Sequence, residues 1–509
     1  MTAKPRSVGV IGGGTAGLFA ALAVKRRFPE IDVTVLESSA VPIIGVGEAT
    51  TTLMPPFLHL QLGLDPADLF RRVKPTFKLG IRFAWGPPGG FTYPFGDADP
   101  VAAFSFDGAL DNQSLTSLLM LADRAPVLRG PDGRLTSLLS QVKFAYHLDN
   151  ATFVAFLKAA AARAGINHED VTIATVDVGE EGVTALRSDD GRAHGFDVYV
   201  DASGFRSLLL EQALGSPFES YAGSLFCDRA IVATVPQTGP IQPYTTAETM
   251  AAGWCWRIPV EGEDHRGYVH ASAFLDEEAA VDEMARANPG MGEPRVVRFR
   301  SGRHRDMWIK NVVALGNAFA FVEPLESTAL HMAIVGVGFL LEGIARLADA
   351  DAHRSYVAFA NRTVAAQWDY LRWFLAIHYR FNRRLDTPFW RAARAEVDVT
   401  GLAAALERFS AEGPGAVAGD NPAAIWFNGL TTLLLGQQVP TPAARVEQPR
   451  AAWQARVAGD QRTVGLALPQ AEALAVLRAH PEMLLDLVRD SRSWYPQELA
   501  LLSSLQQRR

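Results

Sequence analysis

The first residues whose types and spacing could do chemistry form a glycine-rich turn at residues 12–17, with the pattern Gly-x-Gly-x-x-Gly. In such a turn Gly12 makes the tight bend, Gly14 lets the backbone approach a pyrophosphate, and Gly17 lets a helix pack closely on a strand. Glu37 lies 20 residues after Gly17, where a carboxylate bonds a ribose hydroxyl. The spacing therefore predicts a dinucleotide-binding site.

The segments around this turn have the order that a dinucleotide-binding unit requires. Residues 8–11 predict a short buried strand, residues 18–26 a helix, and residues 33–37 a second strand. The motif alone leaves open whether the nucleotide is FAD or NAD. Two later segments, 197–204 and 312–318, have the pattern of strands that return to the same sheet. A nucleotide unit whose strands recur along the chain, with other material between them, favours FAD.

Several further segments combine residue types in an unusual way. Residues 45–50 form a second small-residue turn, residues 253–259 contain the string W-x-W-x-I-P, and residues 321–328 lead through Pro-Leu-Glu-Ser-Thr into an apolar helix. Here the sequence resembles the flavin-dependent halogenases of the tryptophan halogenase family, of which the W-x-W-x-I-P string is a signature. Residues 377–390 resemble another stretch typical of that family. The likeness extends from residue 7 to about residue 395.

The resemblance implies a reaction in two places. Reduced FAD and oxygen convert a bound halide to hypohalous acid, which travels through the protein to a separate aromatic site. There Lys78 would hydrogen-bond the oxidant or form a haloamine, and Glu326 would polarise it or stabilise positive charge on the ring. Taken alone, Lys78 has the pattern of a surface lysine and Glu326 that of a helix-start carboxylate. His331, in the apolar helix, is expected to be a buried structural histidine.

The expected cofactor and halide sites follow from the turn and from the resemblance. The resemblance places the halide at the backbone N–H groups of Thr328 and Ala329, because a helix N-terminus binds an anion without a charged side chain. Ala329 stands where the family usually carries glycine, and from this difference we expect bromide to be used at least as well as chloride. The residues assigned to FAD are Gly12, Gly14, Thr15, Ala16, Gly17, Glu37, Gly47, Ala49, Asn317 and Leu330.

An aromatic cluster at residues 91–96 indicates the substrate side. It resembles the family segment that sandwiches an indole ring, with Tyr93 and Phe95 as the stacking faces. Trp254 and Trp256 would separate the flavin from the substrate. The C-terminal part shows no alignable counterpart of the lid that clamps the amino-acid end of free tryptophan. We therefore expect an indole, or a larger indole-bearing compound in an open site, in preference to free tryptophan.

These elements predict an α/β fold with an FAD-binding box of the glutathione-reductase or PHBH type, an inserted substrate sheet and a helical C-terminal part. We assign residues 1–398 to the FAD-binding core with the interleaved sheet. Residues 399–509 form a mainly helical subdomain in this prediction, since Gly/Pro breaks there separate segments with helical spacing.

Composition limits the remaining classes of function. The 48 Lys+Arg and 55 Asp+Glu residues give a formal net charge of −7, which argues against a nucleic-acid-binding protein. Cys227 and Cys255 have neither metal-ligand spacing nor a disulfide pattern, so we expect no metal site and a cytoplasmic location. The longest apolar stretch is too short to span a membrane.

Two questions about function follow from the sequence: where reduced flavin comes from, and whether the chain is a halogenase at all. It shows no NADH site, so reduced flavin is expected from a separate NAD(P)H-dependent flavin reductase. Two other functions remain open at this point: a flavin monooxygenase that hydroxylates an aromatic compound, and a non-catalytic FAD-binding protein.

Overall fold

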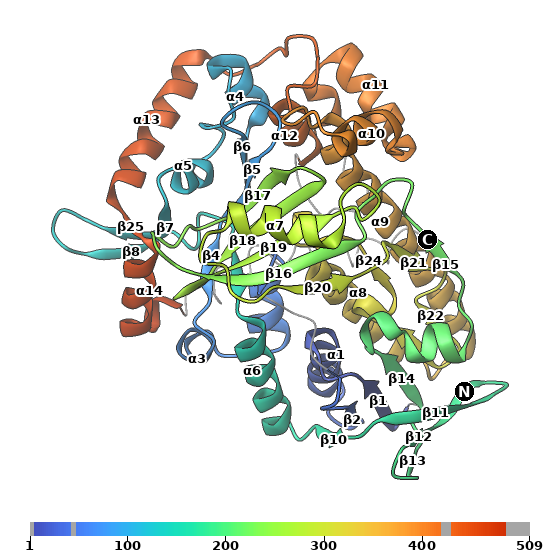
Figure 1. Cartoon of the computed structure of the whole chain (residues 1–509). Coiled ribbons are helices and arrows are strands. Elements are labelled where there is room, and N and C mark those ends of the chain that lie inside the picture. The colour runs from blue at the N-terminus through green and yellow to red at the C-terminus, as the bar shows by residue number, and fades with distance from the viewer. Residues whose placement is uncertain (1–4, 42–46, 419–428, 485–509) are drawn as a thin grey trace.

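The computed structural model describes residues 5–41, 47–418 and 429–484 (Figure 1). A six-stranded sheet carries the glycine turn, in the order β10-β2-β1-β14-β23-β22, and only the last pair is antiparallel. The four strands expected from the sequence all pair within this sheet, so the predicted α/β class is confirmed. The strands are β1 (Ser7–Ile11), β2 (Asp32–Glu37), β10 (Asn167–Asp170), β14 (Val198–Asp201), β22 (Trp308–Ile309) and β23 (Val312–Ala314).

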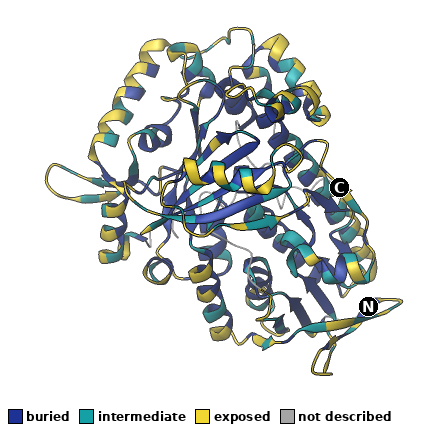
Figure 2. Ribbon diagram, in the orientation of Figure 1, coloured by how far each residue is buried: buried dark blue, intermediate teal, exposed yellow. Residues whose placement is uncertain are grey.

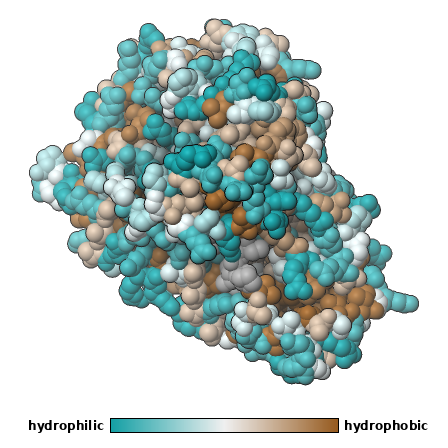
Figure 3. Space-filling model, viewed as in Figure 1, coloured by the Kyte–Doolittle hydropathy of each residue, from teal (hydrophilic) through white to brown (hydrophobic). Residues whose placement is uncertain are grey.

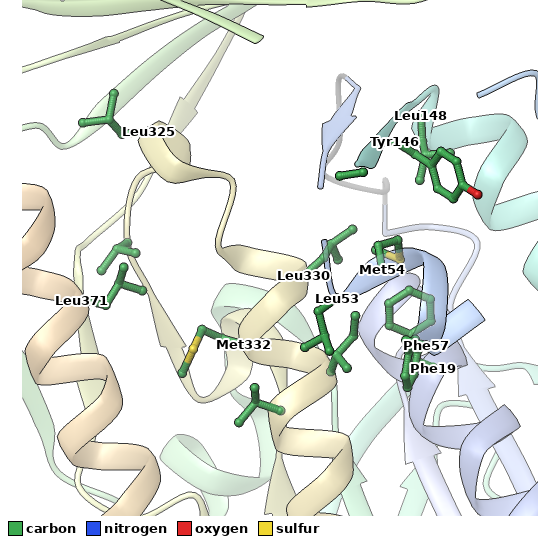
Figure 4. Packing of buried hydrophobic residues seen from close by; sticks show 14 of the residues in the cluster. Phe19, Leu53, Met54, Phe57, Tyr146, Leu148, Leu325, Leu330, Met332 and Leu371 are labelled. Carbon is green, nitrogen blue, oxygen red and sulfur yellow. The ribbon is translucent and has the colours of Figure 1, made fainter. Parts of the chain in front are cut away.

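Helix α1 (Thr15–Arg27) packs against both α6 (Asn150–Arg163) and α8 (Ala329–Ile344). Phe19 of α1 meets Phe57 edge to face with ring centroids 4.8 Å apart, and both side chains are fully buried (Figure 4). Each such ring contributes roughly 1.5–3 kcal/mol by leaving water. Helix α8 is apolar on nearly all sides and buried, as predicted. This packing fixes the start of α8 beside the glycine turn.

The second large sheet has seven strands, in the order β20-β16-β19-β18-β17-β5-β6, and only β17 and β5 are parallel. It joins two separate parts of the chain, as the predicted inserted sheet requires. Helix α7 (Glu277–Ala287) covers one face, and Figure 2 shows it exposed above buried strands. The strands are β5 (Gly80–Ala84), β6 (Phe91–Pro94), β16 (Arg229–Pro236), β17 (Thr245–Met250), β18 (Gly253–Pro259), β19 (Glu263–His270) and β20 (Arg295–Arg298).

A small antiparallel sheet connects the cofactor side to the reaction side. In it β9 (Ala145–Leu148) pairs with β3 (Glu48–Ala49) and with β4 (Thr76–Lys78). All residues of β4 are buried. The sheet therefore sets Lys78 inside the molecule, two strands away from β3, which belongs to the small-residue segment 45–50.

The C-terminal part is mainly helical among the described residues. Its one short strand, β25 (Ala467–Pro469), pairs with β7 (Arg124–Arg129). The Gln470 side chain accepts a 2.8 Å hydrogen bond from the Phe77 backbone N–H, next to Lys78. The division at residues 398 and 399 stays a prediction. The helices of the C-terminal part are α11 (Ala403–Glu412), α12 (Gly429–Gly436), α13 (Arg450–Leu466) and α14 (Gln470–Ala479), and the core before them ends with α9 (Ala350–Phe381) and α10 (Pro388–Glu396).

The outer surface is polar over much of its area, as expected for a fold whose apolar strands and helices are buried. The face drawn in Figure 3 carries hydrophilic residues over much of its area, with hydrophobic residues between them. In the described part of the chain, no helix is long and apolar enough to cross a membrane.

Candidate active site

The glycine turn has the geometry that its sequence predicts. Gly12 has φ of +114°, and a Cβ there would lie 2.2 Å from the Ala202 carbonyl oxygen. A Cβ on Gly17 would lie 2.0 Å from the Gly12 carbonyl oxygen. No atom lies within 4 Å of a Cβ built on Gly14. Gly12 and Gly17 are therefore required by packing, whereas Gly14 faces open space into which a pyrophosphate fits.

A cavity of about 430 Å³ begins at this turn and extends to Trp256 and Ser327. Its lining is mainly apolar with a few polar and charged residues, and its size is that of a small-molecule site. Every residue that the sequence assigned to FAD lines it except Gly17, whose part is to let α1 approach the strand. The cavity and the open side of Gly14 fit a bound dinucleotide.

Glu37 lines the cavity as expected, but it also has protein partners that the sequence did not indicate. Its Oε1 accepts a 2.7 Å hydrogen bond from Lys158, and its Oε2 lies 2.7 Å from Nε2 of His168. The carboxylate keeps lone pairs for a ribose hydroxyl, since each oxygen accepts more than one hydrogen bond. The two partners hold Glu37 in place at the cavity edge.

Lys78 is fully buried, so the interpretation as a surface lysine is wrong. Its Nζ donates a 2.7 Å hydrogen bond to Oγ of Ser327 and lies 5.3 Å from the centroid of the Phe95 ring. Burial lowers the pKa of Lys78 to about 7, against the opposing effect of the Glu326 carboxylate. Near neutral pH this amine therefore exists in both protonation states, which suits a group that hydrogen-bonds or reacts with an oxidant.

Glu326 is also fully buried, at the end of the turn before α8. Its Oε1 lies 2.9 Å from Nε2 of His378, while its Oε2 has no hydrogen-bond partner among the described residues. Burial raises the pKa of Glu326, and His378 and Lys78 oppose that rise. The next residue, Ser327, has φ of +58° and turns the chain so that its hydroxyl meets Lys78. Two predicted catalytic groups thus come together around one turn.

The expected halide position lies at the N-terminus of α8. Thr328 is the N-cap residue, it is fully buried, and its hydroxyl has no hydrogen-bond partner within the described structure. Ala329 begins the helix and lines the cavity together with Ser327. The first N–H groups of a helix have no partner within the helix, so this end can hold an anion beside the cavity.

Trp254 and Trp256 lie at alternate positions of β18 with ring centroids 5.9 Å apart. Trp256 lines the cofactor cavity, whereas Trp254 contacts Trp85, with centroids 6.4 Å apart. Nε1 of Trp254 donates a 3.2 Å hydrogen bond to Oε1 of buried Glu323. The pair therefore lies between the cavity and the ring of Trp85, and its role in separating flavin from substrate stays a prediction.

Aromatic residues from the segment 91–96 and from β5 lie beside the predicted catalytic pair, Lys78 and Glu326. The ring of Phe83 stacks with that of Tyr93 at 6.4 Å and lies 5.3 Å from His378. Tyr93 and Phe95 are both buried. Burial, and after it the Glu326 carboxylate, raises the pKa of Tyr93. The structure thus brings both predicted stacking residues to Lys78 and Glu326.

His331 agrees with its expected structural role. Its Nδ1 lies 2.9 Å from the hydroxyl of Thr51, and burial lowers its pKa to about 4, so the ring is neutral at physiological pH. One group of possible metal ligands occurs elsewhere among the described residues, where single atoms of Asp149, Glu263 and His265 lie within 4.8 Å of one another. None of these three residues belongs to the predicted catalytic pair or to the aromatic residues beside it.

Sequence reasoning assigned no role to two residues that complete the site, Ser327 and His378. Ser327 stands directly after Glu326, so its position in the turn was the available signal. His378 lies in a segment that the resemblance had singled out, but nothing in its spacing shows that α9 carries it to Glu326.

Comparisons with known proteins agree with this geometry. A profile of the tryptophan halogenase family matches residues 7–450. The tryptophan 6-halogenase ThaL of Streptomyces albogriseolus is 31% identical over 431 residues, which are 77% of this chain and 79% of that protein. The structure of MibH, a lanthipeptide tryptophan 5-halogenase, is 46% identical with a TM-score of 0.90, over 95% of each chain. BrvH, a flavin-dependent halogenase from Brevundimonas sp. BAL3, is 30% identical with a TM-score of 0.80, over 93% of this chain and 99% of that one.

Proposed function

The chain belongs to the tryptophan halogenase family and is a flavin-dependent halogenase, and we propose that it halogenates the indole ring of a tryptophan residue held within a peptide. Membership of this family decides against an aromatic hydroxylase. The presence of both Lys78 and Glu326, buried side by side with Ser327, argues against a non-catalytic FAD-binding member of the family. The proposal adds to the family assignment the size of the substrate and the roles of individual residues.

The observation that carries the peptide substrate is the likeness to MibH. At 46% identity over 95% of both chains it is much greater than the 31% identity to ThaL. It agrees with the expectation of a larger indole-bearing compound, drawn from the lack of an alignable clamp for the amino-acid end of free tryptophan. The aromatic pair Trp494 and Tyr495, the nearest alternative to such a clamp, lies outside the described residues.

In this proposal the residues of the cavity hold FAD, and the N-terminus of α8 holds the halide. The chemistry that bound reduced FAD supplies is the oxidation of halide to hypohalous acid with oxygen. The Lys78 ammonium donates a hydrogen bond to the oxygen of that acid and aims the halogen at one ring carbon. Ser327 fixes the direction of the Lys78 amine, since their hydrogen bond is 2.7 Å long. Glu326 stabilises the positive charge that develops on the ring.

Partners and location complete the proposal. A separate NAD(P)H-dependent flavin reductase supplies the reduced cofactor. Both cysteines are buried free thiols, which agrees with a reducing compartment, and we place the enzyme in the cytoplasm. We retain residues 1–398 as the FAD-binding core and 399–509 as the C-terminal subdomain. Both bromide and chloride serve as halide, with bromide used at least as well.

The test is a competition among three substrates at equal concentration: indole, free tryptophan and a short peptide with one internal tryptophan. The reactions contain the full chain, FAD, a generic flavin reductase, NADH and oxygen, with sodium bromide or sodium chloride. Mass spectrometry should find the halogen isotope doublet mainly on the peptide. Preferential halogenation of free tryptophan would contradict the peptide substrate while leaving the family assignment in place.

A further inference from the structure

His378 is the one member of the buried site whose part in the reaction is still unassigned. It lies on α9, and its ring is 1% exposed. Nδ1 lies 2.9 Å from the backbone carbonyl oxygen of Phe374, one helical turn earlier. A carbonyl oxygen only accepts, so Nδ1 carries a hydrogen and donates it. This contact leaves Nε2 as the ring atom whose protonation can change.

Nε2 faces Oε1 of Glu326 at 2.9 Å, and a contact of that length between nitrogen and oxygen requires one proton between them. Because Nδ1 already holds its hydrogen, the pair has two arrangements: imidazolium with carboxylate, or imidazole with carboxylic acid. Both are neutral overall. His378 and Glu326 therefore share one proton in either case.

The surroundings of His378 and Glu326 are aromatic and contain few other titratable groups, so a pair without net charge is favoured over a lone carboxylate. Phe83, Trp85 and Phe374 surround the imidazole, with ring centroids 5.3 to 6.0 Å away. The titratable groups that act on Glu326 or are acted on by it are Lys78 from β4 and Tyr93 from β6, besides His378 itself. A lone carboxylate in such a place would cost several kcal/mol, whereas a hydrogen-bonded opposite charge offsets that cost.

We propose that His378 is a positioning residue that keeps Glu326 ionised at neutral pH, so that Oε2 of Glu326 removes the ring proton during halogenation. This role rests on the proposed function. Oε1 is held by His378, whereas Oε2 has no hydrogen-bond partner among the described residues and is the atom free to act as a base. On the aromatic side of the site, Tyr93 is near enough for the Glu326 carboxylate to raise its pKa, and Phe95 lies 5.3 Å from Nζ of Lys78.

Atoms and protons balance in the halogenation step. The ring carbon attacks the halogen of hypohalous acid, so that the carbon–halogen bond forms and the oxygen–halogen bond breaks. The leaving hydroxide takes a proton from the Lys78 ammonium and departs as water. The C–H bond then breaks, its electron pair restores the aromatic ring, and the proton goes to Oε2 of Glu326. Transfer of that proton to the Lys78 amine restores both residues. The net change is Ar–H plus HOX to Ar–X plus water.

Halogenation needs Glu326 ionised and Lys78 protonated at the same pH. Loss of the imidazole should separate the pH ranges in which these two conditions hold. Burial raises the pKa of Glu326, and His378 is the largest effect that opposes the rise. Without His378 the pKa of Glu326 rises further, so the protonated form, which cannot take up the ring proton, is favoured at neutral pH. Raising the pH to ionise it removes the Lys78 ammonium, because the pKa of Lys78 is about 7. Few molecules then hold both the base and the ammonium.

The variant to make is His378→Gln, whose amide can keep a hydrogen bond to Glu326 but cannot carry the proton. With the tryptophan peptide we expect kcat at pH 7 to fall about 10²-fold, with little change in KM. The acid limb of the pH profile should move to higher pH. A peptide deuterated on the indole ring should show a primary isotope effect in the variant and little in the wild type, because proton removal becomes rate-limiting.

The matched control is His59→Gln. His59 is another buried histidine with Nδ1 on a backbone carbonyl, at 2.8 Å from Leu64, and Nε2 on an oxygen, at 3.1 Å from the Tyr146 hydroxyl. It lies outside the site, so its variant reports the cost of burying glutamine in place of histidine. It should leave the pH profile and the isotope effect unchanged. Oxidation of a small diffusible halogen acceptor by hypohalous acid should persist in both variants.

A lower kcat in His378→Gln with an unmoved acid limb and no isotope effect would reduce His378 to a packing residue and overturn the inference. If the variant loses FAD binding, infrared spectroscopy of the wild type decides the question: we expect an ionised carboxylate band for Glu326 at pH 7, identified by its loss in Glu326→Gln, and a protonated carboxyl band would refute the inference. Failure of the proposed function has a different signature. The wild type would then make hypohalous acid but leave the indole unmodified.

Discussion

At the glycine turn the chain offers backbone atoms and open space, whereas at Lys78 it offers side chains packed in apolar surroundings. No atom lies within 4 Å of a Cβ on Gly14, yet Lys78, Glu326 and His378 are each at most 1% exposed. A pyrophosphate needs N–H groups and room, and both come from local backbone conformation. Control of a reactive halogen needs charges with altered pKa values, and these come from burial of distant residues together.

Because the two ends differ in this way, single changes at the reaction end should abolish chemistry without loss of the cofactor. Lys78→Ala should reduce halogenation at least about 10³-fold, because Lys78 is the only fully buried lysine among the described residues. FAD binding, followed by flavin fluorescence, should persist. The control is Lys143→Ala. Lys143 is partly exposed, so this variant measures the effect of shortening a lysine away from the buried site. Product formation by Lys78→Ala near the wild-type rate would exclude a role for Lys78 in guiding the oxidant.

At the glycine turn, two glycine-to-alanine changes should have different effects, one on the stability of the fold and the other on FAD affinity. Gly17→Ala should destabilise the protein by about 2–3 kcal/mol, because its Cβ would meet a backbone oxygen at 2.0 Å. Gly14→Ala should keep its thermal midpoint and lose FAD affinity by roughly tenfold, about 1.4 kcal/mol, since the methyl group occupies space needed by the cofactor. Thermal unfolding and flavin titration of both variants measure the two effects. Equal loss of stability in both variants would contradict the assignment of Gly17 to packing and of Gly14 to cofactor binding.

A smaller effect concerns the pH range of halogenation. The Lys78 pKa of about 7 is lowered by burial, so the ammonium is present below pH 7 and is lost as the pH rises above it. Ser327→Ala removes the hydroxyl that accepts the Nζ hydrogen bond. Because a hydrogen bond to a charged group contributes about 1.5–3 kcal/mol, loss of the bond should lower the pKa of Lys78 and move the alkaline limb of the rate profile to lower pH by about one to two units. An unmoved limb would show that Lys78 does not set it.

The smallest expected effect is on halide choice. Ala329 begins α8 and lines the cavity, so its methyl group can influence the anion without removing the N–H donor. Ala329→Gly should move the ratio of brominated to chlorinated product toward chloride by about threefold or less, which is at most ~0.7 kcal/mol. Mass spectrometry of reactions with equal bromide and chloride measures the ratio. A wild type that makes mainly chlorinated product would refute the expected bromide use.

What could be predicted from the sequence is what neighbouring residues decide among themselves. The glycine turn needs only a strand, particular backbone angles and a helix start, so Gly12, Gly14 and Gly17 carry its geometry within one short segment. The tryptophans of β18 alternate along one strand, so their common side was also local information. The same holds for the start of α8, where Thr328 and Ala329 stand at the end of the helix that presents them.

Other features depended on the tertiary structure, because they are distances between residues that the sequence keeps apart. Lys78 meets Ser327 across 249 positions, and His378 meets Glu326 across 52. The partners of Glu37 arise in the same way. The chemistry of these groups depends on water being absent and on a second group within about 3 Å, and only the packed core determines both. The sequence by itself therefore determined which residues could react, and the fold decided which of them share a proton.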